Sequence, residues 1–193
     1  MGSFVPIATQ RSNTGIPTGK LAVWWVIGSE IVIFGGLLGS YIMFRLLHVN
    51  EFSSAAANTN TVLGSINTFI LLSSSLSAVL SHNAVEHKNY EKAFKYLWLT
   101  FAGGLGFLCV KYFEWSTEIA HGLVLGKNLF WNFYYTAAGI HALHVIAGMV
   151  IMAIISFDVR KGQNVHRVEN IANYWHFVDL VWIFLFPLLY IAK

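Results

Sequence analysis

Long apolar runs separated by short polar segments dominate the chain. The runs, rich in Leu, Ile, Val, Phe and Ala, cover about 21–47, 61–81, 96–113, 130–157 and 172–192. A helix needs about 20 residues to cross the roughly 30 Å of bilayer hydrocarbon, and an open sheet would leave its edge groups without partners there. The pattern predicts an all-α integral membrane protein, a bundle of five transmembrane helices within residues 20–193.

The first 19 residues differ from the rest of the chain. They contain two prolines, three glycines and no apolar core, which predicts a flexible polar tail at 1–19 and not a cleaved signal peptide. Overall, 56% of the 193 residues are hydrophobic and 11% are charged, and the mean hydropathy is +0.59. These values exclude an ordinary soluble domain. The formal charge of +3 comes with no basic face that would suit nucleic acid.

The positive charges are unevenly divided between the two ends of the predicted bundle. One side collects Arg11, Lys20, Lys88, Lys92, Lys95, Arg160, Lys161 and Arg167, and the other Arg45, Lys111, Lys127 and Lys193. Because Lys and Arg concentrate on the cytoplasmic side of membrane proteins, we expect the N-terminus inside and the C-terminus outside.

Small residues mark where helices are expected to approach closely. Gly35 and Gly39 have GxxxG spacing in the first span, the second contains "LLSSSLSAVLS", and the third contains Gly103, Gly104 and Gly106. Helices associate in lipid through such small residues, so we expect them at contacts within the bundle.

A few ionisable residues lie inside the predicted spans, where their cost makes a functional role the default hypothesis. Glu30 is about ten residues into the first span, roughly 15 Å deep at 1.5 Å per residue. His141 and His144, in "AGIHALHVIAG", reach a similar depth on the fourth span. We therefore expect an intramembrane polar site in which Glu30 pairs with one of the two histidines. The alternative is a protonated Glu30 bonded to a serine or a carbonyl.

The same histidines are weak candidates for cofactor ligands. Their i, i+3 spacing suits two ligands of zinc or copper, but the rest of a ligand set is missing. The iron of a haem is bound by ligands on opposite faces of the ring, and two residues one turn apart on the same helix cannot supply both. His82 and His176 leave one bis-histidine haem as a lesser alternative. We assign this chain no metal, no cofactor and no catalytic residue.

The last span begins with a second polar group, "ANYWHFVDLVWIF". His176 and Asp179 share a helix face, which predicts a charge-assisted hydrogen bond between them. With Trp175, Glu169 and Arg167 they are expected to form a contact for lipid or a partner subunit on the inner side. A helix cap near Glu169 is the alternative.

Several segments together resemble subunit III of the haem-copper respiratory oxidases, the cytochrome c oxidase subunit III family, in its short five-helix bacterial form. The segments are "WWVIGSEIVIFGGLLGSYI", "NTFILLSSS", "KYFEW", "GIHALHVIAG" and "VENIANYWHFVDLVWIFLF". By this resemblance Glu30 corresponds to the carbodiimide-reactive glutamate of the family, and His141 and His144 to its helix histidines.

The resemblance implies a non-catalytic subunit of a terminal oxidase in a bacterial inner membrane. Haem and copper would lie in partner subunits I and II, with a small subunit IV or a respiratory supercomplex as further partners. The chain would bind phospholipid, stabilise the catalytic subunit and support its proton uptake. A proton-collecting surface would suit His82, Glu86, His87, Glu91, His166 and Glu169, although an ordinary solvated loop explains them too.

Other functions stay open at this point. Subunit III of a quinol oxidase and a homologue associated with nitric oxide reductase look alike at this level. A proton-coupled transporter would use Glu30 and the histidines as its coupling site, but five spans give no even inverted repeat. A b-type haem carrier is disfavoured by the histidine geometry.

Overall fold

The computed structural model describes residues 18–192. Its helices are α1 (Thr18–Leu47), α2 (Val49–Ala56), α3 (Thr61–Glu86), α4 (Tyr90–Ala120), α5 (Leu129–Arg160) and α6 (Arg167–Phe186), followed by a π-helical turn at Pro187–Ile191. In this part of the chain five helices are long and apolar enough to cross a membrane, which confirms the prediction of a five-helix membrane protein. The predicted tail lies outside the described residues up to position 17, and Thr18 and Gly19 already belong to α1.

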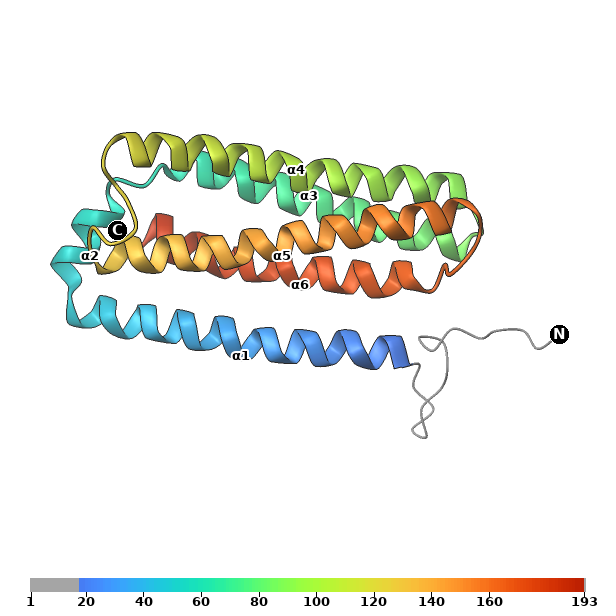
Figure 1. Ribbon diagram of the computed structural model, residues 1–193, viewed down its shortest axis with the longest axis horizontal. Helices are drawn as coiled ribbons and strands as arrows, with labels where there is room; N and C mark the ends of the chain where they lie inside the picture. Colours follow the sequence, from blue (N-terminus) through green and yellow to red (C-terminus); the bar gives the residue numbers. More distant parts are fainter. Residues whose placement is uncertain (1–17, 193) are drawn as a thin grey trace.

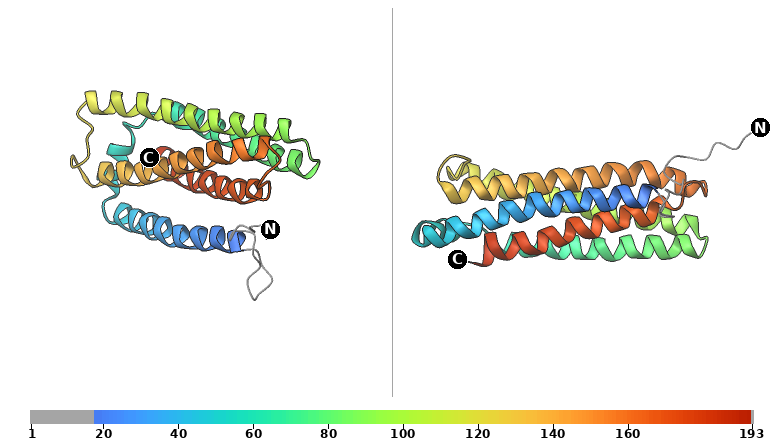
Figure 2. Two further views of the ribbon diagram at one scale, coloured as in Figure 1. Left: turned by 45° about the vertical axis from the view of Figure 1, so that its right-hand side comes forward. Right: turned by 90° about the horizontal axis from the view of Figure 1, so that it is seen from below.

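Successive long helices run in opposite directions and lie in three layers, with α1 alone on one side, α5 and α6 in the middle, and α3 and α4 on the far side (Figure 1). The two views of Figure 2 show the same arrangement and place α1 next to α5 and α6. We call the end of the bundle that carries α2 and the C-terminus the α2 end, and the opposite end, with the loop at 161–166, the α5–α6 end.

Asparagine side chains set the starts of three long helices. Asn60 Oδ1 accepts hydrogen bonds from the backbone N–H groups of Val62 and Leu63, while Asn89 and Asn128 cap α4 and α5 through Lys92 and Trp131. These bonds satisfy donors that a helix leaves unpaired in its first turn. The caps therefore fix how far each helix extends toward the membrane boundary.

Glycines hold α3, α4, α5 and α6 close together. A Cβ added at Gly103 would lie 2.5 Å from the Cβ of Ser74, and one at Gly104 would lie 2.8 Å from the ring of Trp175. The prediction for Gly35 and Gly39 is wrong within this chain, because an added Cβ would meet nothing within 4 Å at either position. The reason is that α1 lies beside the bundle and buries few residues, namely Ile27, Phe34 and Tyr41.

Pro187 explains the wide turn that ends the last span. It has no N–H to continue the α-helical hydrogen bonds, and the chain widens into a π-helical turn that leaves carbonyls in need of donors. Other elements supply them: Tyr41 donates to the carbonyl of Leu188 at 2.8 Å, Thr61 to that of Tyr190 at 3.2 Å, and Arg45 to that of Ala192. These bonds tie α1 and α3 to the end of the last span, with Leu189 and Tyr190 buried.

Candidate functional site

Glu30 of α1 and His144 of α5 face each other between the helices. Nε2 of His144 lies 3.0 Å from Oε2 of Glu30, and the two side chains are 19% and 15% exposed. Ser29, the neighbouring serine, donates instead to the carbonyl of Val26. The contact predicted between Glu30 and one of the two histidines is thus present, with His144 as the partner.

The hydrogen-bond partner of His144 on its own helix shows which ring nitrogen carries a hydrogen. Its Nδ1 lies 2.8 Å from the carbonyl oxygen of Ile140, and because a carbonyl can only accept, Nδ1 must carry a hydrogen. One further proton, either on Nε2 of His144 or on the carboxyl of Glu30, then makes the interaction between these two groups attractive. A pair holding that proton has no net charge, which removes most of the cost of its position between membrane-spanning helices.

His141, one turn away on α5, has a different environment. It is completely buried between the rings of Phe107 and Trp182, with centroid distances of 5.4 and 5.2 Å. Neither ring nitrogen has a hydrogen-bond partner. His141 therefore packs in the aromatic core and does not join the Glu30 contact.

The polar residues at the start of α6 pair with other helices. Glu169 accepts from Lys20 of α1 at 2.5 Å, and Arg167 lies 3.5 Å from Asp158 of α5. Trp175, expected to contact lipid or a subunit, is fully buried and donates from Nε1 to the hydroxyl of Ser74 at 3.0 Å. That expectation is wrong for Trp175, because the indole is enclosed by α3, α4 and α5.

The predicted hydrogen bond between His176 and Asp179 is absent. Nδ1 of His176 lies 2.5 Å from the hydroxyl of Ser75 on α3, while Asp179 is 3% exposed and both its carboxyl oxygens lack a hydrogen-bond partner. The i, i+3 spacing does place His176 and Asp179 on one face of α6, but α3 supplies the hydrogen-bond partner of His176. With so little exposed surface, Asp179 cannot form the expected lipid or subunit contact.

A groove opens between α1, α5 and α6 near the α5–α6 end. Its volume is about 370 Å³, and its walls are mainly aliphatic. The lining residues are Ala22, Val23, Val26, Ile151, Ile155, Arg167, Asn170, Ile171 and Tyr174. The hydroxyl of Tyr174 donates to the carbonyl of His144 at 3.3 Å. Tyr174 thus connects the wall of the groove with the backbone of α5 at His144.

A buried charged cluster near the α2 end was missed by the sequence reasoning. Lys111 Nζ is 3.0 Å from Glu114 Oε2, 2.5 Å from the hydroxyl of Tyr190 and 3.2 Å from that of Tyr134. Lys111, Glu114 and Glu118 are 2%, 1% and 5% exposed. Their i, i+3, i+7 spacing along α4 was the available signal. The predicted third span ended at 113, before Glu114 and Glu118, whereas α4 continues to Ala120.

These polar groups do not form a metal site. Among residues 18–192, no three or more His, Cys, Asp or Glu side chains are arranged to hold a metal ion. The midplane contact can bind a proton and hold two helices together, and the buried cluster supplies ionic and aromatic packing.

Comparison with known proteins gives a consistent result. Residues 8–193 match the family described as cytochrome c oxidase subunit III. Cytochrome c oxidase subunit 3 of Thermostichus vulcanus is 35% identical over 84% of this chain and 82% of its own length. A heme-copper oxidase subunit I+III of Aeropyrum pernix is 32% identical over 90% of this chain, which corresponds to 22% of that longer protein.

A relative from a second oxidase type also matches. The cytochrome bo(3) ubiquinol oxidase subunit 3 of Buchnera aphidicola is 26% identical over 88% of this chain and 84% of its own length. Given the five apolar helices and the family match over nearly the whole sequence, this multi-pass membrane chain belongs to the cytochrome c oxidase subunit III family of the haem-copper oxidases.

Proposed function

We propose that this chain is a non-catalytic subunit that keeps the catalytic subunit of a terminal oxidase in its working state. The observation that carries the proposal is the family match over residues 8–193. Haem and copper would lie in subunits I and II, with a subunit IV or a supercomplex as further partners. The relative whose name joins subunits I and III supports subunit I as the direct neighbour of this chain.

The groove between α1, α5 and α6 is the proposed phospholipid site. Aliphatic residues line it, and Arg167 and Asn170 provide polar groups at one end, which suits an acyl chain with an anionic headgroup. The guanidinium of Arg167 is 34% exposed at its side chain, so a phosphate can approach it without displacing Asp158.

The contact between Glu30 and His144 would hold α1 against α5 and so maintain the distance between the helices that form the groove. Few residues of α1 are buried against the bundle, so a polar contact near the middle of the helix has a large share in fixing its position. A neutral pair sharing one proton performs this role without a net charge in the hydrocarbon.

The polar residues at the α5–α6 end would collect protons for the catalytic subunit. Glu86 and Glu91 are exposed carboxylates beside His82 and Arg160, at 3.5 and 3.4 Å. His166 fits this role less well, because burial and the neighbouring Arg167 charge lower its pKa and leave it neutral at pH 7. With these residues on the cytoplasmic side, the chain would lie in a bacterial inner membrane with its N-terminus inside.

Two electron donors are compatible with this proposal. The subunits from Thermostichus vulcanus and Buchnera aphidicola carry the names of a cytochrome c oxidase and a ubiquinol oxidase, and the donor binds elsewhere in such a complex. We favour cytochrome c, because the family match and the more similar of these two relatives carry that name. A transporter or haem carrier has no such support.

Affinity purification of the tagged chain in mild detergent tests the proposal. We expect haem-bearing subunits I and II to co-purify, with oxygen consumption driven by reduced cytochrome c. A tagged chain lacking α1 is the matched control for loss of the groove. Recovery of the full chain without any haem-bearing partner would contradict the proposal, and activity with quinol alone would assign it to a quinol oxidase.

A further inference from the structure

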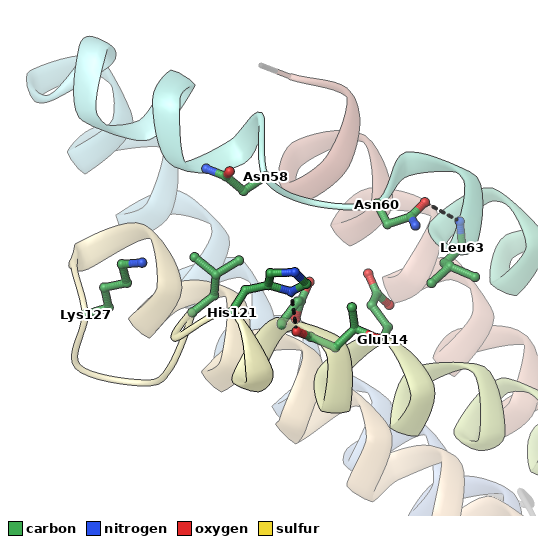
Figure 3. A pocket seen from close by; sticks show the side chains of 9 residues that line it. Asn58, Asn60, Leu63, Glu114, His121 and Lys127 are labelled. Atoms are coloured by element: carbon green, nitrogen blue, oxygen red, sulfur yellow. Dashed lines mark hydrogen bonds between the residues drawn. The ribbon is translucent and has the colours of Figure 1, made fainter.

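A polar pocket of about 500 Å³ opens at the α2 end, away from the groove of the proposed function. It lies between the α2–α3 linker, the last turns of α4 and the loop before α5, as Figure 3 shows. Its lining is Asn58, Asn60, Leu63, Glu114, Thr117, Glu118, His121, Leu123 and Lys127. The buried charged cluster forms its floor.

Counting hydrogens shows that the cluster lacks donors. Lys111 has three N–H hydrogens, one each for Glu114 Oε2, Tyr134 and Tyr190. The hydroxyl of Tyr134 donates to Glu118 Oε1 at 3.0 Å, and that of Tyr190 lies 3.0 Å from Tyr134. The one hydrogen of Tyr190 goes either to Tyr134 or to Glu114. Every hydrogen is in use in both cases, and Oε1 of Glu114 still has no partner.

The two remaining oxygens belong to different glutamates. Oε1 of Glu114 is buried and has no hydrogen-bond partner. Oε2 of Glu118 is 3.4 Å from the hydroxyl of Tyr135, but that hydroxyl has one hydrogen, which the carbonyl of Leu123 accepts at 2.6 Å. Both glutamates line the pocket, and Figure 3 shows the carboxyl of Glu114 directed into it.

The charges of the cluster are unbalanced as well. Two carboxyl groups face one amine, that of Lys111, and all three side chains are almost fully buried. With both carboxyls ionised, the cluster therefore carries one negative charge without a counterion. An uncompensated charge is costly at such a position. A group that brings a positive charge and N–H donors into the pocket would satisfy both the charge and the free oxygens.

The other side of the pocket is basic. Lys127 lies across the pocket from Glu114 in Figure 3, and His121 lies between them. A ligand with a cation at one end and an anion at the other therefore matches the pocket better than a bare metal ion, which would leave most of the volume empty. The pocket also lies at the ends of membrane-spanning helices, where lipid headgroups are found.

We propose that this pocket binds a primary ammonium group linked by a short spacer to an anion, with the ammonium on Glu114 and Glu118 and the anion at Lys127. The ethanolamine headgroup of a phospholipid has this chemistry, and so does a small soluble zwitterion. A quaternary ammonium does not meet the requirement, because it has no N–H to donate.

Native mass spectrometry of the delipidated full-length chain tests this site. Phosphatidylethanolamine, phosphatidylcholine and phosphatidylglycerol are offered separately, and soluble glycerophosphoethanolamine serves as a fourth probe. We expect phosphatidylethanolamine to bind roughly tenfold more tightly than the other two lipids, because it alone forms charge-assisted bonds with both glutamates. Binding of the soluble probe without the lipid would support the site and identify a soluble ligand as its source.

Matched variants assign the binding to this pocket. Glu118→Gln keeps the oxygen that accepts from Tyr134 but removes the charge, and should weaken the preferred probe about tenfold. Lys127 lies on an exposed loop, and Lys127→Met should weaken binding of the preferred probe several-fold. Glu51 is exposed at the same end of the bundle, and Glu51→Gln should leave binding unchanged. Equal retention of the ethanolamine and choline lipids, or unchanged binding by Glu118→Gln, would overturn the proposal.

Discussion

Replacing Lys111 with methionine should destabilise the protein strongly. Its ammonium is buried, contacts Glu114 at 3.0 Å and lies 4.9 to 5.7 Å from the centroids of four aromatic rings. Methionine has a similar volume and leaves the carboxylate of Glu114 buried without its counterion. Removing one partner of a buried ion pair costs about 3–5 kcal/mol, and we expect a loss of that size in the free energy of unfolding.

A double variant separates charge from packing. Lys111→Met combined with Glu114→Met replaces the pair with apolar side chains, which is often close to neutral for an ion pair, and leaves Glu118 as the one ionisable carboxyl of the cluster. The double variant should therefore recover at least about 2 kcal/mol of the loss, within the range of coupling energies measured between contacting residues. Lys95→Met, an exposed change on the same helix, is the control and should stay within about 0.5 kcal/mol of wild type.

Unfolding in mixed detergent micelles, followed by tryptophan fluorescence, measures these differences. Trp182 is one of seven tryptophans; it is fully buried, and its ring centroid is 5.4 Å from Lys111 Nζ, so its contribution to the emission reports on the cluster. A loss below about 0.5 kcal/mol for Lys111→Met would refute the reasoning. So would a double variant as unstable as the sum of the two single variants.

Two further predictions concern helix contacts. Infrared difference spectra should show a carboxyl band of Glu30 that shifts in His144→Leu and disappears in Glu30→Gln; an unshifted band in His144→Leu would mean that the two groups share no proton. Gly103→Ala should destabilise the chain by about 1–3 kcal/mol, because the new methyl group would lie 2.5 Å from the Cβ of Ser74. Gly36→Ala, where a Cβ meets nothing within 4 Å, should leave stability unchanged in the same unfolding assay, and equal losses would contradict the packing argument.

Hydropathy and depth were sufficient to predict much of the architecture. Five apolar runs predicted five membrane helices, and counting 1.5 Å per residue placed Glu30 at the depth of the histidines. Their sequence positions could not decide between His141 and His144, because both lie on the face of α5 toward the bundle. The choice depends on the position of α1, which contacts His144 through Glu30 and leaves His141 to the rings of Phe107 and Trp182.

The errors have physical causes. The i, i+3 spacing predicted a hydrogen bond between His176 and Asp179, but the hydroxyl of Ser75, on another helix, is the partner of His176. The predicted third span ended at 113, because hydropathy cannot show that Glu114 pairs with Lys111 inside the bundle and that Tyr190 accepts a hydrogen bond from the same ammonium. Contacts between helices distant in sequence determined the result in both cases.

Activity of the purified oxidase during prolonged turnover tests the supporting role of this chain most directly. Oxygen consumption by the complex with and without the chain should begin at similar rates, since the chain is proposed to contain no catalytic group. The complex that lacks it should then lose activity several-fold faster per turnover, and adding the chain back should restore its lifetime. Equal lifetimes with and without the chain would contradict the account.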